Sequence, residues 1–362
     1  MAEPCAGLRQ FGWDEFFAER FPAGDGLIPA RVVAEHRSNY RVQTAVAPAA
    51  ACLAGKLRHR AGCHADLPAV GDWVAVQSPA GNGDLVIHDV LPRRSKFSRK
   101  VAGERTDEQV VAANVDYVWI VTALDADFNL RRIERYLTLA WDSGASPVIV
   151  LNKADLAAGA ESKRWEVESL SPATPVHAIS SLTGEGLGDL AGYLQNHATV
   201  ALLGSSGVGK STLINALAGT ILQETGSLRE DGKGRHTTTG RQLIRLPGGG
   251  LIVDTPGMRE LQLWDAGAGL ADTFSDIDDL AAACRFSDCQ HAEEPGCAVT
   301  AAVQQGLLPP ERLASYQKLQ RELAHLDRKQ DARARQLEKQ RNRSMAKSLR
   351  HHPKYKRRDG RS

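Results

Sequence analysis

The amino-acid sequence predicts a multidomain protein in which a small β-barrel precedes a central α/β domain and a C-terminal α-helical module. Three observations support this prediction. Short β-type runs fill residues 27–100, apolar runs alternate with amphipathic runs between 101 and 268, and three cysteines and a histidine lie close together in 269–327. The 362 residues, 42% hydrophobic and 24% charged, are ordinary for a soluble protein of two or three domains.

Residues 1–26 are expected to form an N-terminal extension whose aromatic stretch, 13–21, either packs on the next domain or stays free. The β-type runs of 27–100 are separated by turn residues, and five such strands are typical of an OB-type barrel, which commonly binds nucleic acid. The following side chains could bind RNA, or could equally form a solvated barrel face: Arg31, Arg37, Tyr40, Arg41, Lys56, Arg58 and Arg60.

The region 101–268 alternates predicted strands with predicted helices. Strands are expected at 115–124, 147–151, 175–179, 199–203, 241–246 and 250–254. Helices are expected at 130–142, 161–170, 186–196 and 210–218. The alternation predicts a parallel, doubly wound sheet, in which ligands bind at the carboxyl ends of the strands.

The strongest motif matches the phosphate-loop pattern G-x-x-x-x-G-K-[ST] and lies between a predicted strand and a predicted helix. Its residues are Gly204, Ser205, Ser206, Gly207, Val208, Gly209, Lys210 and Ser211, followed by Thr212. The glycines let backbone N–H groups turn toward phosphate oxygens. Lys210 is expected to reach the β- and γ-phosphates, and Ser211 to bind Mg²⁺. A glycine-rich turn without a ligand is the alternative.

Three further motifs indicate that the nucleotide is GTP with Mg²⁺. In the tetrad Asn152, Lys153, Ala154 and Asp155, the last residue would accept hydrogen bonds from guanine N1–H and N2–H₂, a donor pair that adenine lacks. The loop of Ser180, Ser181 and Leu182 is expected under the base, although its serines could instead cap the following turn. Asp254 would hold the Mg²⁺ shell, and the N–H of Gly257 would contact the γ-phosphate.

The order of these motifs is unusual, because the base-reading tetrad precedes the phosphate loop. Ordinary GTPases carry them in the opposite order. We therefore predict a circularly permuted P-loop GTPase domain over 101–268. Such a permutation can fold because the termini of compact domains usually lie close together at the surface.

Catalysis needs a group that orients the attacking water. Met258 stands where Ras-like enzymes carry a glutamine. We assign that role to His236, because neutral imidazole accepts a proton near pH 7, while an exposed loop histidine is the alternative. Thr238 or Thr239 is expected to bind Mg²⁺ in the GTP state, and the expected catalytic set is Lys210, His236 and Thr238.

Cys284, Cys289, His291 and Cys297 form the pattern C-x4-C-x-H-x5-C. Three thiolates and one imidazole suit a closed tetrahedral Zn²⁺ site that stabilises the fold. A chance grouping of thiols is the alternative, and a distant imidazole such as that of His59 could replace His291. The other three cysteines are expected to be free thiols.

The basic charge lies at the C-terminus. Residues 311–362 contain 17 Lys and Arg against 6 Asp and Glu, so this segment carries +11 while the whole chain carries +2. A helix is expected at 316–337, and 328–362 should form a basic, flexible tail that suits phosphate backbones. A solubilising or membrane-surface tail is the alternative. The chain lacks a signal-peptide pattern and any run of 18 apolar residues, so we expect a cytoplasmic protein.

Several segments resemble the bacterial ribosome small-subunit-dependent GTPase A (RsgA) family. They are FSRK at 97–100, QVVAANVD at 109–116, ALDADFNLRRIERYL at 123–137, NKAD, GSSGVGKST, GRHTTT at 234–239, DTPG and EPGCAV at 294–299. The resemblance implies a late assembly factor that binds the immature small ribosomal subunit and its RNA, hydrolyses GTP to GDP and then leaves. A GTP-regulated RNA-binding chaperone is the alternative, and the permuted order disfavours a translation or tRNA-modification GTPase. We expect a monomer with no membrane partner.

Overall fold

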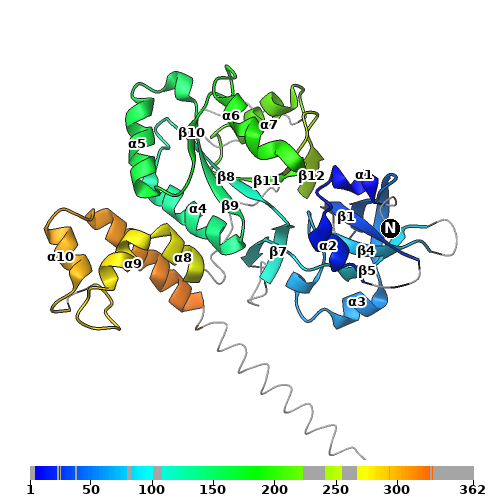
Figure 1. Cartoon of the computed structure of the whole chain (residues 1–362), viewed down its shortest axis with the longest axis horizontal. Helices are drawn as coiled ribbons and strands as arrows, with labels where there is room; N and C mark the ends of the chain where they lie inside the picture. Colours follow the sequence, from blue (N-terminus) through cyan, green and yellow to red (C-terminus); the bar gives the residue numbers. More distant parts are fainter. Residues whose placement is uncertain are drawn as a thin grey trace, which may run out of the picture.

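The computed structural model describes residues 5–328, except for 23, 25, 37–38, 80–82, 101–107, 223–240, 255–266, 293 and 327. A β-barrel, an α/β domain and a helical module follow one another along the chain, coloured blue, cyan to green, and yellow to orange in Figure 1. This architecture confirms the predicted fold class. Residues 329–362 of the predicted tail lie outside the described part of the chain.

The barrel has five strands, and it closes because β1 pairs with both β2 and β4. They are β1 (Leu27–His36), β2 (Asn39–Gln43), β3 (Pro48–Leu53), β4 (Trp73–Gln77) and β5 (Leu85–Val90). Their inward side chains, with Leu57 of α3 (Gly55–Arg60), form one hydrophobic cluster. The closed five-stranded order is that of an OB-type barrel.

Two of the residues considered for RNA binding are buried, so that part of the prediction is wrong. Tyr40 is 4% exposed because its side chain joins the barrel core. Arg31 is 2% exposed and donates hydrogen bonds to Gly71 O (3.2 Å), Asn114 O (3.0 Å) and Thr199 Oγ1 (3.0 Å). Burial lowers the pKa of Arg31 to about 10, although nearby carboxylates oppose this change. Arg31 therefore joins the barrel to the α/β domain.

The N-terminal extension packs on the barrel through aromatic side chains. Helices α1 (Ala6–Arg9) and α2 (Glu15–Glu19) flank Trp13, whose ring lies 4.8 Å from that of Trp73 in an edge-to-face arrangement. Leu8, Phe17 and Leu91 complete this buried cluster. The aromatic stretch therefore packs on the barrel and is not free, which decides between the two alternatives considered for it.

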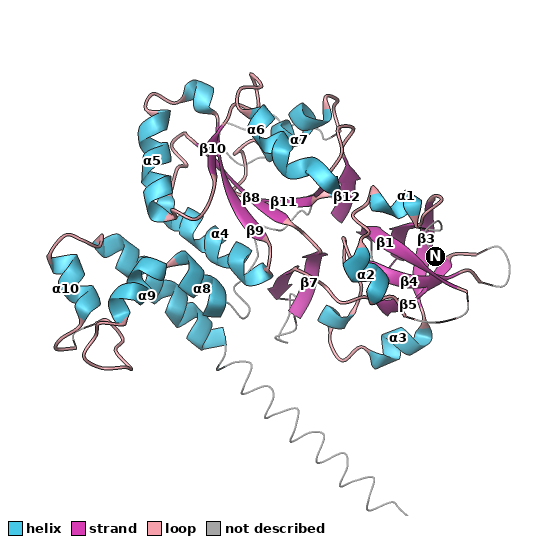
Figure 2. Cartoon of the chain, in the orientation of Figure 1, coloured by secondary structure: helices cyan, strands magenta, loops and turns pink. Residues whose placement is uncertain are grey.

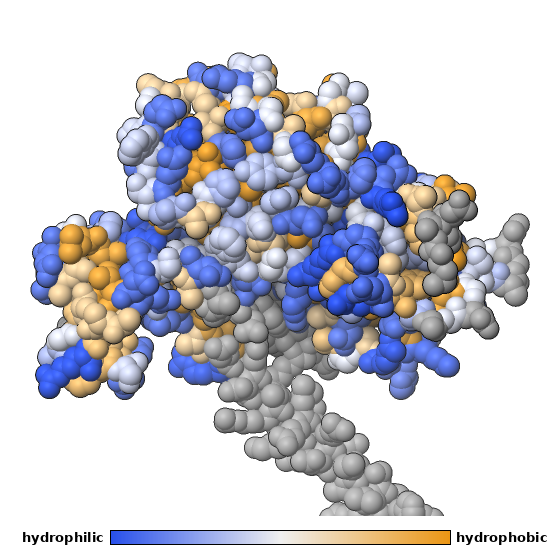
Figure 3. Space-filling model, viewed as in Figure 1, coloured by the Kyte–Doolittle hydropathy of each residue, from blue (hydrophilic) through white to orange (hydrophobic). Residues whose placement is uncertain are grey.

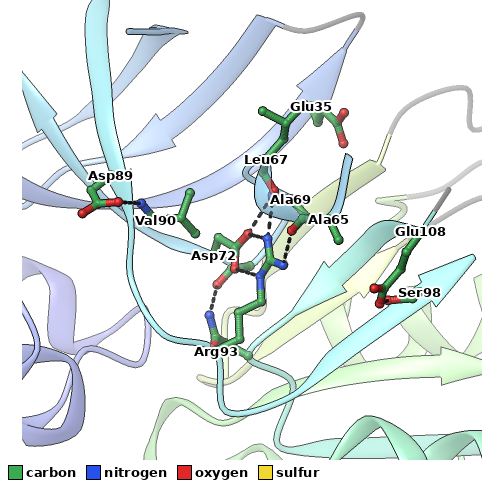
Figure 4. A network of polar contacts seen from close by, with 12 residues as sticks. Glu35, Ala65, Leu67, Ala69, Asp72, Asp89, Val90, Arg93, Ser98 and Glu108 are labelled. Atoms are coloured by element: carbon green, nitrogen blue, oxygen red, sulfur yellow. Dashed lines mark hydrogen bonds and ion pairs between the residues drawn. The ribbon is translucent and has the colours of Figure 1, made fainter. Parts of the chain in front are cut away.

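A buried ion pair fixes the segment between α3 and β4 (Figure 4). Arg93 donates to both carboxylate oxygens of Asp72 at 2.8 and 2.7 Å. It also donates to the carbonyls of Ala65 (2.7 Å) and Leu67 (2.8 Å), and the Asp72 carboxylate accepts the N–H of Ala69 at 2.8 Å. The Asp72 side chain is fully buried and that of Arg93 is 15% exposed. Removing the arginine would leave a buried carboxylate without its charge partner.

Replacing Arg93 with alanine should therefore lower the free energy of unfolding by about 3–5 kcal/mol. Urea denaturation of the two proteins measures the difference. Arg60→Ala is the matched control, because Arg60 and Asp89 form an ion pair (2.7 Å) whose side chains are 66% and 43% exposed. Loss of that exposed pair should cost no more than about 1 kcal/mol. Equal losses in the two variants would contradict the structural role of Arg93.

The α/β domain is built on a six-stranded sheet in the order β10-β9-β8-β11-β13-β12. The strands are β8 (Tyr117–Ala123), β9 (Ser146–Asn152), β10 (Val176–Ala178), β11 (Thr199–Leu203), β12 (Arg241–Arg245) and β13 (Leu251–Asp254). Five of them are parallel, as predicted, and each lies within about two residues of its expected range. β12 differs, because it runs antiparallel to β13.

β12 also joins the two sheets. It pairs with β1 of the barrel at Ala34–Gln242 and Glu35–Arg241, so the domain sheet and the barrel form one sheet of 11 strands. The ten-residue β1 is long enough to pair with the barrel and with β12. The pairing covers an edge whose backbone N–H and C=O groups would otherwise lack partners.

Helices cover both faces of the sheet (Figure 2). α4 (Leu130–Ser143) and α5 (Ala160–Leu170) contribute to one hydrophobic cluster, while α6 (Leu187–Ala191) and α7 (Lys210–Ala218) contribute to the other. The predicted helix 186–196 is instead α6 followed by η3 (Gly192–His197), with non-helical backbone at Gln195 and Asn196. A hairpin of β6 (Lys96–Lys100) and β7 (Glu108–Ala113), which the sequence analysis did not predict, joins the barrel to the sheet.

The C-terminal module consists of α8 (Gly267–Thr273), α9 (Ser275–Ala281), α10 (Ala298–Gln304) and a helix over 310–326. This last helix begins six residues before the predicted start at 316, and the rest of the predicted range to 337 is largely outside the described residues. It shares one hydrophobic core with α4, and a Cβ at Gly269 would lie only 2.4 Å from the Thr138 carbonyl. Arg312 donates to Glu134 of α4 at 3.0 Å and to both carboxylate oxygens of Asp276 at 2.7 Å. The module is thus packed tightly on α4.

The visible surface is mostly hydrophilic over α4 and α5, and hydrophobic residues gather over α10 (Figure 3). Leu307 and Phe286 of this module are 74% and 42% exposed. Among the described helices, none is both long enough and apolar enough to span a bilayer.

Candidate functional site

The parallel strands bring the predicted nucleotide motifs to one edge of the sheet. Asn152 ends β9, the serine loop follows β10, the phosphate loop joins β11 to α7, and Asp254 ends β13. Carboxyl ends of neighbouring parallel strands meet at the same edge, where such sheets bind ligands. The described motif residues therefore lie together, although Asn152 and Asp254 are 102 positions apart in the sequence.

One buried side chain connects three of these loops. Asn152 is 1% exposed, and its amide nitrogen donates to Val208 O in the phosphate loop at 2.7 Å. Its amide oxygen accepts hydrogen bonds from the N–H (3.0 Å) and hydroxyl (2.9 Å) of Ser181. A satisfied buried network of this kind holds the base-reading, serine and phosphate loops in a fixed relative position.

Two glycines of the phosphate loop are required by close contacts. A Cβ at Gly204 would lie 2.2 Å from Val121 O, and a Cβ at Gly209 would lie 2.2 Å from the Asn152 amide nitrogen. Gly209 also has φ +98°, a left-handed conformation that disfavours other residues. The loop can therefore pass close to β8 and β9 only with glycine at these positions.

Lys210 and Ser211 lie at the start of α7, where the backbone N–H groups and the helix dipole favour an anion. The Lys210 ammonium donates to Gly204 O at 2.8 Å and to Ser205 O at 2.6 Å. Val208 is buried, Ser206 and Thr212 are half-buried, and Gly207 is exposed. When a nucleotide binds, this ammonium group can exchange its hydrogen bonds to the loop carbonyls for hydrogen bonds to phosphate oxygens.

The base-reading side of the edge carries two different kinds of serine. Ser180 Oγ accepts the N–H of Thr183 at 3.1 Å and so caps its own turn, whereas Ser181 bonds Asn152. The capping role considered for this loop is thus present, and the position of the loop under the base stays a prediction. Asp155 is exposed, and Leu182, in the loop that follows β10, is 81% exposed. An exposed carboxylate and an exposed apolar side chain at the same edge of the sheet suit the polar edge and flat face of a base.

Sequence reasoning missed two residues that hold these loops, one in the β8–α4 connection and one in the first turn of α4. Asp125 accepts a hydrogen bond from the Lys153 ammonium at 2.9 Å, and Arg132 donates to Ser205 Oγ at 2.6 Å. Partial burial acts to raise the pKa of Asp125, but the Lys153 hydrogen bond and charge outweigh it, so the pKa lies below its usual value. The signal was the segment 123–137, which was noted for its resemblance without assigning roles to single residues.

Three predicted site residues cannot be placed. His236, Thr238 and Gly257 lie outside the described residues, as do Thr237 and Thr239. Asp254 is described at the end of β13 and is half-buried.

Asp155→Asn should change the base that is bound. The asparagine amide would donate where guanine N2–H₂ also donates, so GTP affinity should fall by at least about 100-fold. Xanthosine triphosphate carries a carbonyl at that position and should bind the variant better than GTP. Competition binding with the two nucleotides measures the switch, and Asp189→Asn, an exposed aspartate on α6, is the control. Unchanged preference for GTP would remove Asp155 from the base site.

The four residues of the metal motif also lie together. Their ligand atoms are all within 4.8 Å of one another. Cys284 Sγ is 3.9 Å from Cys297 Sγ, and His291 Nδ1 lies 3.7 Å from Cys284 Sγ and 3.5 Å from Cys297 Sγ. Tetrahedral zinc bonds of normal length require about 3.8 Å between two sulfurs and about 3.6 Å between sulfur and nitrogen. The cluster therefore fits Zn²⁺, and its imidazole is that of His291.

The backbone turns His291 into the cluster with φ +58°, and Gln317 donates to its carbonyl at 2.8 Å. Desolvation raises the pKa of Cys289 to about 11. Burial also acts to raise the pKa of Cys297, but hydrogen bonds with Thr300 and His291 outweigh it and lower the pKa to about 6. One thiolate is thus favoured by the protein alone, and a metal ion would favour deprotonation of the others.

The motif order, the strand order and the phosphate loop together define a circularly permuted P-loop GTPase with a C-terminal Cys₃His cluster. The chain is accordingly a GTP hydrolase that binds GTP, GDP and Mg²⁺. It belongs to the RsgA GTPase family, whose family model matches residues 90–264. A model described as 50S ribosome-binding GTPase matches residues 199–333.

Relatives match along most of the chain. It is 51% identical over 336 residues to the small ribosomal subunit biogenesis GTPase RsgA of Opitutus terrae, covering 90% of this chain and 92% of that one. Identity to the protein of the same name from Streptomyces coelicolor is 45%, with 91% and 90% covered. The crystal structure of YjeQ from Thermotoga maritima matches with a TM-score of 0.62 and 31% identity over 82% of this chain and 99% of that one. YloQ, a circularly permuted GTPase, shares the fold with a TM-score of 0.57, 21% identity, and 84% and 98% covered.

Proposed function

We propose that this GTPase acts late in the maturation of the small ribosomal subunit and is released after it hydrolyses GTP. The observation that carries the proposal is the 51% identity, over 92% of its length, to a relative that is named a small ribosomal subunit biogenesis GTPase. The architecture agrees, because one sheet connects an OB-type barrel to the nucleotide edge. A subunit bound by the barrel would thus contact a domain that is fixed relative to the site.

Ribosomal RNA is the proposed ligand of the barrel and of the tail at 328–362. Four of the basic residues considered for this role are exposed: Arg41, Lys56, Arg58 and Arg60. Exposed cations bind phosphate backbones with the release of counterions, so the affinity should fall steeply with salt. Deleting 328–362 should weaken RNA binding and flatten its salt dependence. Unchanged binding would exclude a role of the tail in RNA binding.

At the nucleotide edge, we assign base recognition to Asn152, Lys153, Asp155 and the serine loop, and phosphate binding to 204–212. Ser211, Asp254 and Thr238 would hold Mg²⁺. Water orientation is assigned to His236. This hypothesis predicts that His236→Ala keeps GTP affinity but loses subunit-stimulated turnover. Full stimulated turnover in that variant would exclude the role.

We further propose that the Cys₃His cluster binds one Zn²⁺. The ion would have all four positions filled by protein and so would stabilise the module without acting on substrate. The short loops between the ligands offer little hydrophobic core of their own. The metal bonds and the core shared with α4 would therefore hold these loops in place.

The test of the ribosomal role is GTP turnover with and without purified small subunits. We expect slow intrinsic hydrolysis and strong stimulation by small subunits, because ordering of a switch against the partner can complete an active site. Purified large subunits are the control, and equal stimulation by both, or by neither, would overturn the proposal. Subunit release distinguishes this proposal from the RNA chaperone alternative. If GTP cleavage drives release, then release should be faster with GTP than with a non-hydrolysable analogue.

A further inference from the structure

The first turn of α4 contacts the phosphate loop. Arg132, the third residue of the helix, donates through one guanidinium nitrogen to Ser205 Oγ at 2.6 Å and to Asp127 Oδ2 at 2.5 Å. The backbone of the same residue donates to the N-cap side chain of Asn129 at 3.1 Å. The backbone of Arg132 is therefore fixed by the helix cap, and its guanidinium is fixed by the Asp127 carboxylate.

Ser205 is held from two sides. Arg132 binds its hydroxyl, and the Lys210 ammonium binds its carbonyl at 2.6 Å. A P-loop lysine binds the β- and γ-phosphates when nucleotide is present, so its bond to Ser205 O must weaken when GTP enters. Arg132 bonds the Ser205 hydroxyl and so leaves the backbone N–H groups of the loop available to phosphate, and this contact can persist. Within the described part of the chain, it then helps to keep this part of the loop in place.

The helix that carries Arg132 is a firm support. Ile133 and Leu137 of α4 are buried in the main hydrophobic core. Glu134 is fully buried and accepts a hydrogen bond from Arg312 of the C-terminal module at 3.0 Å. Because α4 is packed on both the sheet and the module, a side chain on its first turn has a fixed base from which to position a loop.

We propose that Arg132 is a positioning residue of the GTPase: through the Ser205 hydroxyl it holds the first half of the phosphate loop ready for the nucleotide. The effect is preorganisation, because a loop that is already in place loses less freedom when GTP binds. This inference concerns intrinsic nucleotide binding and hydrolysis, so it stands or falls separately from the proposed action on the ribosome.

The expected kinetic result follows from that role. The exposed fractions of Arg132 and Asp127, 32% and 44%, make their ion pair weak by itself, so the functional effect should come from the bond to Ser205. Arg132→Ala should raise KM for GTP by about tenfold and leave kcat within about twofold, because positioning affects ground state and transition state alike. Ser205→Ala should show the same split, and Arg132→Lys, which can still donate to the hydroxyl, should recover part of the loss.

The test is a double-mutant cycle on the full-length protein, with GTP turnover measured in the absence of ribosomes. If Arg132 acts through Ser205, the double alanine variant should be no worse than either single variant. Arg164→Ala is the matched control, because Arg164 also pairs with a carboxylate, Glu168 at 2.8 Å, and its side chain is 41% exposed on α5. That variant should keep the parental KM.

Three outcomes overturn the proposal. Additive losses, or a fall in kcat on Arg132→Ala that Ser205→Ala does not share, would show that the guanidinium acts on the nucleotide directly. A parental KM in both single variants would show that the contact has no functional effect. Should Arg132→Ala fail to fold, as judged by its thermal transition, Ser205→Ala alone decides, because a parental KM in that variant contradicts the proposal.

Discussion

Replacing Lys210 with alanine is expected to lower kcat/KM for GTP by about 100- to 1,000-fold. The ammonium lies over the phosphate loop, 2.8 Å from Gly204 O and 2.6 Å from Ser205 O, and adjoins the start of α7. In the proposed site, this ammonium would neutralise the β- and γ-phosphates as charge develops during cleavage. Steady-state phosphate release measures hydrolysis, and nucleotide titration measures affinity.

The matched control is Lys96→Ala. Lys96 pairs with Glu108 at 2.7 Å on the β6–β7 hairpin, its side chain is half exposed at 50%, and it belongs to none of the nucleotide motifs. That variant should hydrolyse GTP at the parental rate. If Lys210→Ala kept its affinity and rate, the 204–211 loop would not be the phosphate site.

Cys289→Ala should abolish zinc binding. The remaining two thiols and His291 would supply three ligands, and structural zinc sites need four. Zinc content should fall from about one ion per chain to near zero. The segment 284–297 should lose protection against hydrogen exchange, because metal binding supplies much of its folding free energy. The remainder of the protein should unfold at a lower temperature, since the module shares its core with α4.

Cys63→Ala serves as the control, because Cys63 is an exposed free thiol of the barrel. It should retain zinc and the parental transition temperature. Native protein that contains no metal and yet keeps 284–297 folded would contradict the zinc assignment.

Local patterns were enough to predict most of the elements and loops. The apolar runs 199–203 and 147–151 are strands because their side chains are buried between two helical layers, and a short continuous apolar run indicates such burial. The glycine positions of the phosphate loop also follow from local chemistry. For these reasons the order of the motifs was sufficient to predict a permuted domain, although the side-chain roles at the site stay predictions.

Contacts between distant segments were not predictable in the same way. Nothing in the run 30–34 indicates that Arg31 turns inward to Asn114 and Thr199, because this depends on how two domains meet. The pairing of β1 with β12 joins residues more than 200 positions apart, Glu35 and Arg241 among them. Arg132 likewise reaches Ser205 only after the sheet has formed. Periodicity carries no information on such long-range contacts.

The most direct test of this account is a structure of the protein with Mg²⁺ and a non-hydrolysable GTP analogue. The account predicts guanine N1 and N2 within hydrogen-bond distance of the Asp155 carboxylate, the Lys210 ammonium on the β- and γ-phosphates, and Ser211 at the metal. A nucleotide bound elsewhere, or one at this edge with its base away from Asp155, would contradict the central claim that these loops form one GTP site.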